Sequence, residues 1–326
     1  LPEILLEALA RHVPDAETTI IKGSWPVTPF ADIGEVHEAE GDEDELIRAL
    51  EGCEVAFVHA SPFTEKVIAA ATPTLKLITV GRGGPVNINL DAAKKHGVTV
   101  SNAPGRNATA TAEHSVAMIL ASVRQLVDRH NELVAGQWRG DYYAYENVAP
   151  EVRGSTVGLI GYGAIGSRVA RTLHAMGAQV LAYDPYVAAA DMPDAEKLED
   201  LDELLRRSTI LTLHPRLNDE TRGMIGRDQL ALLPEGAIVV NCSRPPVLDY
   251  DALADALDSG HLYAAAADVL PSEPLPSGHR LLHTPRLIVT PHLAGASRES
   301  AQLAAELGAA DIARWLAGEP LKYALT

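Results

Sequence analysis

The sequence predicts an α/β protein with two doubly wound parallel sheets. Short apolar runs alternate with helical stretches between residues 17 and 101, and the same alternation resumes at residue 156. A long helical segment and an aromatic loop separate the two series. Strands that alternate with helices favour parallel sheets whose two faces are both covered. A chain of 326 residues is also long enough for about two domains.

The first series begins after an amphipathic helix that is expected at residues 1–12. Strands are expected at 17–23, 54–60, 75–81 and 97–102, and helices at 44–52, 64–71 and 89–97. Ligands of parallel sheets bind at the carboxyl ends of the strands. The loop GRGGPVN at 81–87 lies at such an end, so it is a candidate ligand loop.

Between the two series, apolar residues recur at helical spacing from residue 108 to residue 135. This pattern predicts one long helix that stops at Gly136. The following loop, residues 136–154, contains Trp138, Tyr142, Tyr143 and Tyr145. Loops of this length in compact domains are usually functional or flexible.

The second series contains six expected strands, at 156–161, 179–184, 209–214, 237–242, 262–269 and 287–292. Helices are expected between them at 164–177, 198–208 and 249–260, and a last helix at 298–317. Six strands wound in this way indicate a Rossmann sheet.

A glycine-rich turn links the first strand of this series to its helix. The pattern G-x-G-x-x-G at 161–166 is weak alone, but here it follows a strand and opens a helix, which is the context for dinucleotide binding. The helix N-terminus attracts phosphates. Asp184 ends the next strand, where a carboxylate binds a ribose 2′-OH and repels a 2′-phosphate, so we expect NAD rather than NADP. The expected cofactor residues are Gly161, Tyr162, Gly163, Ala164, Ile165, Gly166 and Asp184.

Three residues with useful chemistry lie at or just past strand ends of the same series. Taken singly, each has a purely structural alternative. Arg244 could form a surface ion pair, Glu273 could be a carboxylate in a turn, and His292 could be a loop histidine whose hydrogen bonds are satisfied. Together they match alcohol oxidation by NAD: histidine accepts the hydroxyl proton, a carboxylate favours its protonated form, and arginine binds a carboxylate through two hydrogen bonds. Pro245 should also force Arg244 into extended backbone geometry.

Charge and composition exclude several other classes. The net charge of −17 argues against a nucleic-acid partner, although one local arginine could still bind a small anion. Cys53 and Cys242 are expected to be buried thiols, and they support neither a disulfide framework nor a zinc site. No apolar run is long enough to span a bilayer, and no signal peptide is visible, so a cytoplasmic protein without membrane contact is expected. Whether residues precede Leu1 is left open.

These motifs together resemble those of the D-isomer-specific 2-hydroxyacid dehydrogenase family over nearly the whole chain. The matching stretches are residues 102–121, 157–166, 182–186, 241–244, 268–276 and 290–297. The resemblance implies that His292 is the acid/base, that Glu273 pairs with it, and that Arg244 orients the substrate. Formate dehydrogenases of similar fold carry glutamine in place of Glu273, which argues against that reaction.

The resemblance also implies the domains, ligands and partners. Residues 1–104 and 298–326 would form a flavodoxin-like substrate domain, into which a Rossmann NAD-binding domain, 105–297, is inserted. The implied partners are a 2-hydroxy or 2-keto acid and a second copy of the chain in a homodimer, and no metal is expected. His214, Cys242 and Asp268 are further expected cofactor residues, and Arg82, Gly83, Gly84, Arg244 and His292 are the expected substrate residues.

Four departures from the family pattern concern the substrate side. The loop at 81–87 looks shorter than usual, and its Pro85 has no N–H to donate. Arg216 replaces a common proline, as either an extra anion contact or a solvent-facing residue. The tyrosine loop looks longer and could cap the active site or contact a partner subunit. Pro245 replaces a common glycine. We therefore favour an unphosphorylated sugar-derived acid over 3-phosphoglycerate. The alternative function is an NAD(H)-sensing, corepressor-like binding protein on the same fold.

Overall fold

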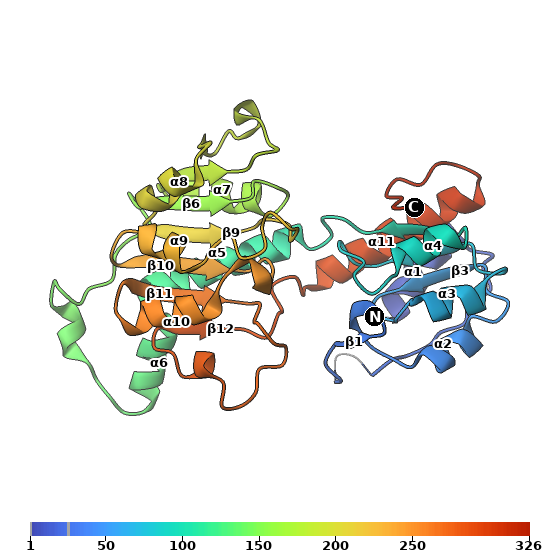
Figure 1. Cartoon of the computed structure of the whole chain (residues 1–326), viewed down its shortest axis with the longest axis horizontal. Helices are drawn as coiled ribbons and strands as arrows, with labels where there is room; N and C mark the ends of the chain where they lie inside the picture. Colours follow the sequence, from blue (N-terminus) through green and yellow to red (C-terminus); the bar gives the residue numbers. More distant parts are fainter. Residues whose placement is uncertain (1, 25–26) are drawn as a thin grey trace. The chain divides into compact units, whose positions relative to one another are not determined.

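The computed structural model describes residues 2–24 and 27–326 (Figure 1). Its contacts divide the chain into two compact units, residues 1–107 with 296–326 and residues 108–295. The first unit is discontinuous in sequence, because the last helix, α11 (Arg298–Leu316), belongs to it. The opening helix α1 spans Pro2–His12, and Leu1 lies outside the described residues.

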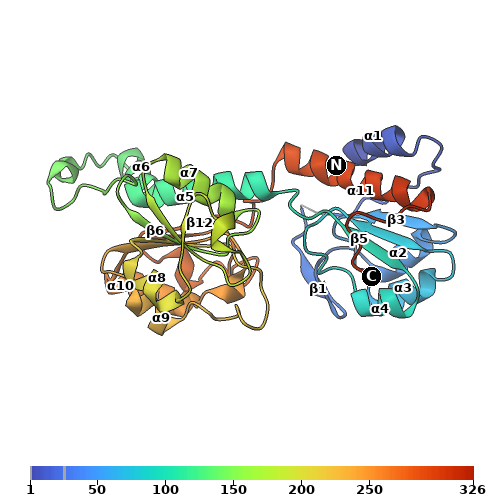
Figure 2. The ribbon, with the colours of Figure 1, turned by 90° about the horizontal axis from the view of Figure 1, so that it is seen from above.

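The first unit is built on a three-stranded parallel sheet in the order β3 (Val55–Val58), β4 (Leu77–Val80) and β5 (Thr99–Asn102). Its connecting helices are α2 (Glu43–Ala49), α3 (Glu65–Ala71) and α4 (Leu90–Lys95). Each begins at a side chain that accepts a backbone N–H of the first turn: Asp42, Thr64 and Asn89. Figure 2 shows α1 and α11 on one face of this sheet and α3 and α4 on the other.

Helix α11 packs unusually close to the sheet. A Cβ added at Gly308 would lie 2.4 Å from the ring of Phe57 in β3. The neighbouring Ala304, Ala305 and Ala309 are also small and buried. The lack of a side chain at Gly308 lets the helix backbone approach this strand, whereas Ala305 and Ala309 pack against Ala8 of α1.

The expected strand at 17–23 is wrong, because those residues form no strand. Ile20 and Ile21 remain 47% and 44% exposed, so the apolar pair that suggested a strand is not buried in a sheet. An antiparallel pair that the sequence did not reveal, β1 (Ala31–Ile33) and β2 (Val36–Ala39), follows instead. Its strands are only three and four residues long, too short to show a strand period in the sequence.

The second unit contains a seven-stranded, fully parallel sheet in the order β12-β11-β10-β9-β6-β7-β8. All six expected strands are present, and this confirms the predicted α/β class with parallel sheets. The bounds are β6 Thr156–Ile160, β7 Gln179–Tyr183, β8 Glu196–Lys197, β9 Ile210–Leu213, β10 Ala237–Asn241, β11 Leu262–Ala267 and β12 Leu287–Val289. The short edge strand β8 was not expected.

Helices cover both faces of this sheet (Figure 2). One apolar core joins the sheet to α5 (Ala108–Arg124) and α7 (Gly166–Ala175). The other joins it to α8 (Leu201–Arg207), α9 (Arg227–Leu232) and α10 (Tyr250–Asp258). Helix α9 was not expected, since its six residues are too few to show a helical period.

The single helix expected at 108–135 is also wrong, because it breaks at Gln125. This residue has φ +47° and separates α5 from α6 (Leu126–Val134). Side chains of α5 are buried against the sheet, whereas no residue of α6 is buried. Apolar spacing continues through Gln125, so the sequence did not reveal the break. The loop 136–154 contains one short 3-10 turn, Gly140–Tyr143.

Candidate active site

The sheet order of the second unit brings three strand ends together. Arg244 follows β10, Glu273 lies in the loop after β11, and His292 follows β12. These three strands are hydrogen-bonded neighbours and run parallel. Their carboxyl ends therefore share one edge of the sheet, where α/β proteins bind ligands.

Glu273 and His292 form a direct pair. His292 Nδ1 lies 2.7 Å from Glu273 Oε2. The other carboxylate oxygen, Oε1, accepts the backbone N–H of Leu270 at 2.9 Å, which fixes the orientation of the carboxylate. A histidine whose Nδ1 donates to a carboxylate presents Nε2 as the nitrogen for proton exchange.

The backbone of His292 is held in a rare conformation. Its φ is +51°, in the left-handed region that non-glycine residues seldom adopt. The N–H of His292 donates to the carbonyl of Asp268 at 2.8 Å. Local strain of this kind persists only where surrounding contacts fix it, and it is common at active sites.

The buried carboxylate of Asp268 supplies those contacts. Its oxygens accept the N–H of Leu293 at 3.0 Å, the N–H of Ala294 at 2.8 Å and the hydroxyl of Thr290 at 2.6 Å. Asp268 is 1% exposed, so these bonds are shielded from water. Within the chain Asp268 thus fixes the loop that carries His292, whereas the sequence had suggested only a cofactor contact.

His114 of α5 completes this network, and sequence reasoning missed it. Its Nε2 lies 3.2 Å from Thr290 Oγ1 and 3.6 Å from Asp268 Oδ1. A histidine on a predicted helix carries no signal of which loop it will face. It gives α5 a contact with the loop of His292.

Arg244 has the extended backbone that its following proline predicts, with φ −140° and ψ 143°. Its carbonyl accepts the amide of Asn241 at 3.2 Å and the N–H of Val247 at 3.3 Å, while its own Nη1 donates to the carbonyl of Ser243 at 2.9 Å. Pro245–Val247 form a 3-10 turn behind it. Among the described residues, no hydrogen bond or ion pair joins Arg244 to Glu273 or His292.

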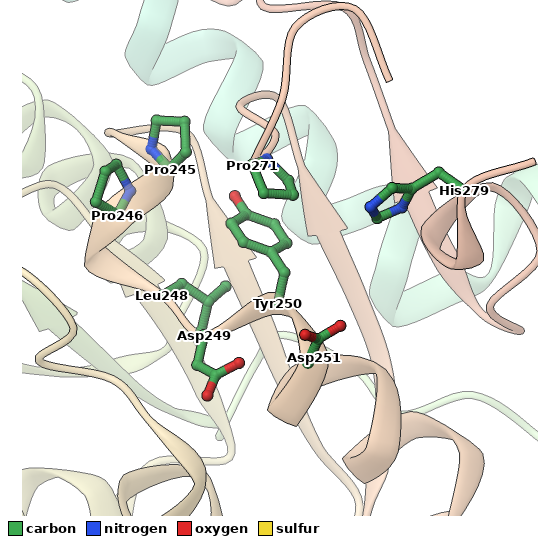
Figure 3. Close-up of a pocket in the computed structure, with 8 residues that line it drawn as sticks. All are labelled: Pro245, Pro246, Leu248, Asp249, Tyr250, Asp251, Pro271 and His279. Atoms are coloured by element: carbon green, nitrogen blue, oxygen red, sulfur yellow. The ribbon is translucent and has the colours of Figure 1, made fainter. Parts of the chain in front are cut away.

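A pocket of about 380 Å³ lies behind this turn (Figure 3). Pro245 and Pro246 form one wall, and Pro271 and Tyr250 face them. The Tyr250 hydroxyl accepts from Asn241 Nδ2 at 3.1 Å. Since Arg244, Glu273 and His292 do not line it, this pocket is separate from the reactive groups.

The glycine turn has the form that a dinucleotide needs. Gly161 has φ +89°, and a Cβ there would lie 2.7 Å from the backbone of His214. A Cβ at Gly166 would lie 2.0 Å from the carbonyl oxygen of Gly161. In contrast, a Cβ at Gly163 would meet nothing within 4 Å. The first and last glycines therefore permit tight packing, and Gly163 leaves open space beside the backbone.

Residues 163–166 also offer unused donors at the start of α7. None of their backbone N–H groups donates to an acceptor in the described part of the chain. Asp184, which is buried, accepts the N–H of Tyr162 at 2.8 Å and that of Tyr186 at 2.9 Å. A carboxylate has about four acceptor positions, so ribose hydroxyls can still bind. These residues fit the pyrophosphate and ribose of NAD.

Two other expected cofactor residues are neutral side chains. Burial lowers the pKa of His214 to about 3, and its Nε2 lies 2.9 Å from Thr212 Oγ1. Burial raises the pKa of Cys242 to about 12, so this residue is a buried thiol, as expected. Cys53 is only half-buried, because it lies in the turn after α2 rather than in a strand.

The expected substrate loop lies in the first unit. Arg82 forms an ion pair with Glu38 and donates to the carbonyl of the same residue at 3.0 Å. Among the residues described, none accepts a hydrogen bond from the N–H of Gly83 or Gly84. Asn102 Nδ2 donates to the carbonyl of Gly83 at 2.8 Å, which fixes the loop. Two backbone donors therefore remain available to an anion.

The tyrosine loop of the second unit is anchored at one residue. Arg129 and Arg139 lie 3.6 Å and 4.8 Å from the ring centroid of Tyr142, whose hydroxyl donates to Glu132 at 2.5 Å. Large apolar side chains of α6 and this loop remain exposed: Leu133, Val134, Trp138, Tyr143 and Tyr145. Arg216 is exposed and forms no ion pair with the described residues.

No cluster of three or more potential metal ligands occurs within residues 2–24 and 27–326. Over the same residues, no helix is both long enough and apolar enough to cross a membrane.

Comparison with known proteins identifies the family. Residues 116–294 match the family model described as D-isomer specific 2-hydroxyacid dehydrogenase, NAD binding domain. The chain belongs to this family. The second unit is accordingly its NAD-binding domain, and the family resemblance seen in the motifs is confirmed.

Individual relatives cover most of the chain. It is 35% identical over 283 residues to D-3-phosphoglycerate dehydrogenase of Archaeoglobus fulgidus, covering 86% of this chain and 53% of that protein. It is 33% identical over 317 residues to glyoxylate reductase of Thermofilum pendens, covering 95% and 91%. The crystal structure of the TT0316 protein from Thermus thermophilus superimposes with a TM-score of 0.80 and 30% identity, over 88% and 90%. The chain spans about half the length of the D-3-phosphoglycerate dehydrogenases it matches.

Proposed function

We propose that the protein is an NAD-dependent D-2-hydroxyacid dehydrogenase, which interconverts a 2-hydroxy acid and its 2-keto acid. The 2.7 Å contact between His292 Nδ1 and Glu273 Oε2 carries this proposal. The pair lies at a strand-end edge of an NAD-binding domain, where an acid/base group is useful for hydride chemistry.

Each reactive side chain has a defined role in this proposal. When a hydroxy acid is oxidised, His292 Nε2 accepts the hydroxyl proton as the O–H bond breaks, and the same proton returns to oxygen in the reverse direction. Glu273 stabilises the imidazolium that forms. Arg244 binds the substrate carboxylate through two parallel hydrogen bonds. Bound NAD supplies the acceptor, or as NADH the donor, of the hydride at C2.

Residues 161–166 would hold the pyrophosphate, and Asp184 would select NAD by binding ribose hydroxyls and repelling a 2′-phosphate. His214, Cys242 and Asp268 would line the same cofactor from the ends of β9, β10 and β11. Their support is position alone, since their side chains are neutral or already bonded within the chain.

Arg82, Gly83 and Gly84 would contribute to substrate binding, with the two glycine N–H groups as donors to a carboxylate. A sugar-derived 2-keto acid is the substrate class we favour. The exposed apolar residues of α6 and the 136–154 loop would contact a second copy of the chain and form a homodimer, because apolar surface of this extent usually marks an interface.

A panel of short 2-keto acids with NADH tests the proposal, with NADH absorbance as the readout. Turnover of at least one member is expected. If NADH binds tightly and no member is reduced, the corepressor-like binding function is favoured instead. Light scattering of the purified protein tests the homodimer, and a monomer at micromolar concentration would contradict it.

A further inference from the structure

Tyr250 is the first residue of α10, and it lies beside the two loops that carry Arg244 and Glu273. Its side chain is buried and forms one wall of the 380 Å³ pocket. Other walls of this pocket come from Pro245 in the loop of Arg244 and from Pro271 in the loop of Glu273 (Figure 3). The hydroxyl of Tyr250 points toward these two prolines. The pocket keeps the two loops apart on this side, so any link between them here has to cross at the tyrosine.

The start of α10 gives the side chain of Tyr250 a rigid base. Asp249 caps the helix, because its side chain accepts the N–H of Ala252 at 3.0 Å. Leu253 and Ala254, in the same turn, are fully buried. The helix therefore fixes the position from which the tyrosine ring projects.

The hydroxyl of Tyr250 takes part in two buried hydrogen bonds whose directions are fixed. It donates to the backbone carbonyl of Val269, because a carbonyl oxygen can only accept. It therefore accepts from Asn241 Nδ2, at 3.1 Å. Burial raises the pKa of this hydroxyl, so it keeps the proton that the bond to Val269 requires.

Asn241 connects the hydroxyl to the loop of Arg244. Its Oδ1 accepts the N–H of Ser243 at 3.0 Å and the hydroxyl of the same residue at 2.8 Å, which leaves Nδ2 to face Tyr250. The same Nδ2 donates to the carbonyl of Arg244 at 3.2 Å. Asn241 is completely buried, so water does not compete for these bonds. The backbone of the Arg244 loop is thus tied to the tyrosine through one amide.

Val269 connects the hydroxyl to the loop of Glu273. The next residue, Leu270, donates its N–H to Glu273 Oε1 at 2.9 Å. The other oxygen of this carboxylate, Oε2, lies 2.7 Å from His292 Nδ1. A movement of the peptide groups at 269–270 would therefore change the orientation of the carboxylate that faces the histidine.

We propose that Tyr250 is a positioning residue, whose hydroxyl holds the loop of Arg244 and the loop of Glu273 in a fixed arrangement. It acts through Asn241 and Val269, and its effect on the reaction rests on the proposed function. Tyr250→Phe would keep the ring in place but leave the carbonyl of Val269 and one N–H of Asn241 without their partner. Buried polar groups that lose a partner favour rearrangement of the backbone that carries them.

Hydrogen exchange, followed by mass spectrometry of the full chain, tests this link without catalysis. In Tyr250→Phe, peptides from 241–249 and from 268–275 should both exchange about fivefold faster or more, while peptides from α7 stay unchanged. The matched control is Tyr263→Phe, because Tyr263 is half-buried in β11 of the same unit and its hydroxyl has no hydrogen bond among the described residues. Exchange that is unchanged in either loop, or equally faster throughout the second unit, would overturn the proposal.

Steady-state kinetics then tests the consequence for the reaction, with the 2-keto acid that the wild type reduces fastest and saturating NADH. At a temperature well below unfolding, Tyr250→Phe should lower kcat/KM by about tenfold or more and leave the Kd of NADH unchanged. We expect KM to rise, because Arg244 binds the substrate, and kcat to fall, because Glu273 supports proton transfer. A change in only one of these constants, or the same loss in Tyr263→Phe, would contradict the coupling of both loops. If the wild type reduces no keto acid but both loops exchange faster in Tyr250→Phe, the proposed function fails and the link between the loops stands.

Discussion

The carboxyl edges of the two parallel sheets differ in how their charged groups are satisfied. In the second unit, His292 has Glu273 as a partner, and Asp268 fixes the loop that carries His292 through three hydrogen bonds from Thr290, Leu293 and Ala294. In the first unit, Arg106 has a buried Nε without a partner. The difference is that contacts within the chain hold the acid/base pair of one edge in place, whereas a buried guanidinium nitrogen of the other has no hydrogen-bond partner among the described residues.

The largest effect on kcat should come from replacing the acid/base residue at the strand-end edge of the second unit. His292→Asn removes the proton-transfer group and should lower kcat by roughly 10²- to 10⁴-fold. NADH affinity should stay unchanged, because the glycine turn is untouched. The control is His283→Asn, since His283 is exposed in the same unit. Steady-state kinetics measures kcat for both variants. Full activity in His292→Asn would remove this residue from the mechanism.

Loss of the contacts that hold the loop of His292 should have the next largest effect on kcat. Asp268→Asn presents an amide NH₂ to backbone N–H groups that now donate to a carboxylate, so the conformation of His292 loses its restraint. We expect kcat to fall by roughly tenfold or more and the protein to lose about 1–3 kcal/mol of stability. His114→Gln, which can still bond Thr290, should lose less kcat than His114→Ala. Equal kcat values for the two His114 variants would indicate that the contact does not position the loop.

Two glycines of the 161–166 turn should affect different properties, one the stability of the second unit and the other the binding of NADH. Gly161→Ala forces a Cβ against backbone atoms at 2.7 Å and keeps φ at +89°, so it should destabilise the second unit by about 1–3 kcal/mol. Gly163→Ala has free space for its Cβ and should leave stability unchanged while weakening NADH binding. Thermal unfolding and NADH titration of the two variants measure the contrast. Similar stability losses in both variants would refute the distinction.

Cofactor choice depends on one acid. Asp184→Ala should narrow the preference for NADH over NADPH by about tenfold, because the repulsion of a 2′-phosphate is removed. The ratio of kcat/KM values for the two cofactors gives the result. A wild-type protein that already prefers NADPH would contradict the proposed role of Asp184.

The smallest effects concern acid stability, and they compare the two units directly. The pKa of His59 is about 4 and that of His214 about 3, both lowered chiefly by burial, against about 6.5 in an unfolded chain. As pH falls below about 6.5, the unfolded chain takes up protons that the folded chain refuses, so stability declines down to those pKa values.

Asn variants of either histidine should therefore flatten the loss of stability between pH 7 and pH 5, as measured by urea unfolding. Arg106 and Arg82 contribute to the shift of His59 but not to that of His214. An unchanged loss of stability between pH 7 and pH 5 in both variants would contradict these lowered pKa values.

Most of the fold could be predicted from the sequence because the patterns that indicate its strands and helices are local. The six strands of the second unit are apolar runs, and the glycine turn lies where a strand meets a helix. The hairpin at 31–39 was missed because its strands are only three and four residues long, and the break at Gln125 because apolar spacing continues through it. Residues 17–23 were misread as a strand because Ile20 and Ile21 form an apolar pair in the sequence, although both are exposed in the structure.

The candidate site was predictable to a similar degree. The strand-end rule placed Arg244, Glu273 and His292 at one edge, and Pro245 predicted the extended backbone of Arg244. The contacts of His114 and Asp268 join segments far apart in the chain, so no local sequence pattern predicts them.

Transfer of deuterium from NADH labelled at C4 tests the central claim most directly. The protein is incubated with the labelled cofactor and the best-bound 2-keto acid, and the product is examined by mass spectrometry. The proposed function predicts a 2-hydroxy acid with deuterium at C2, formed by the wild type and lost with His292→Asn. Tight binding of NADH without deuterium in any product would contradict it.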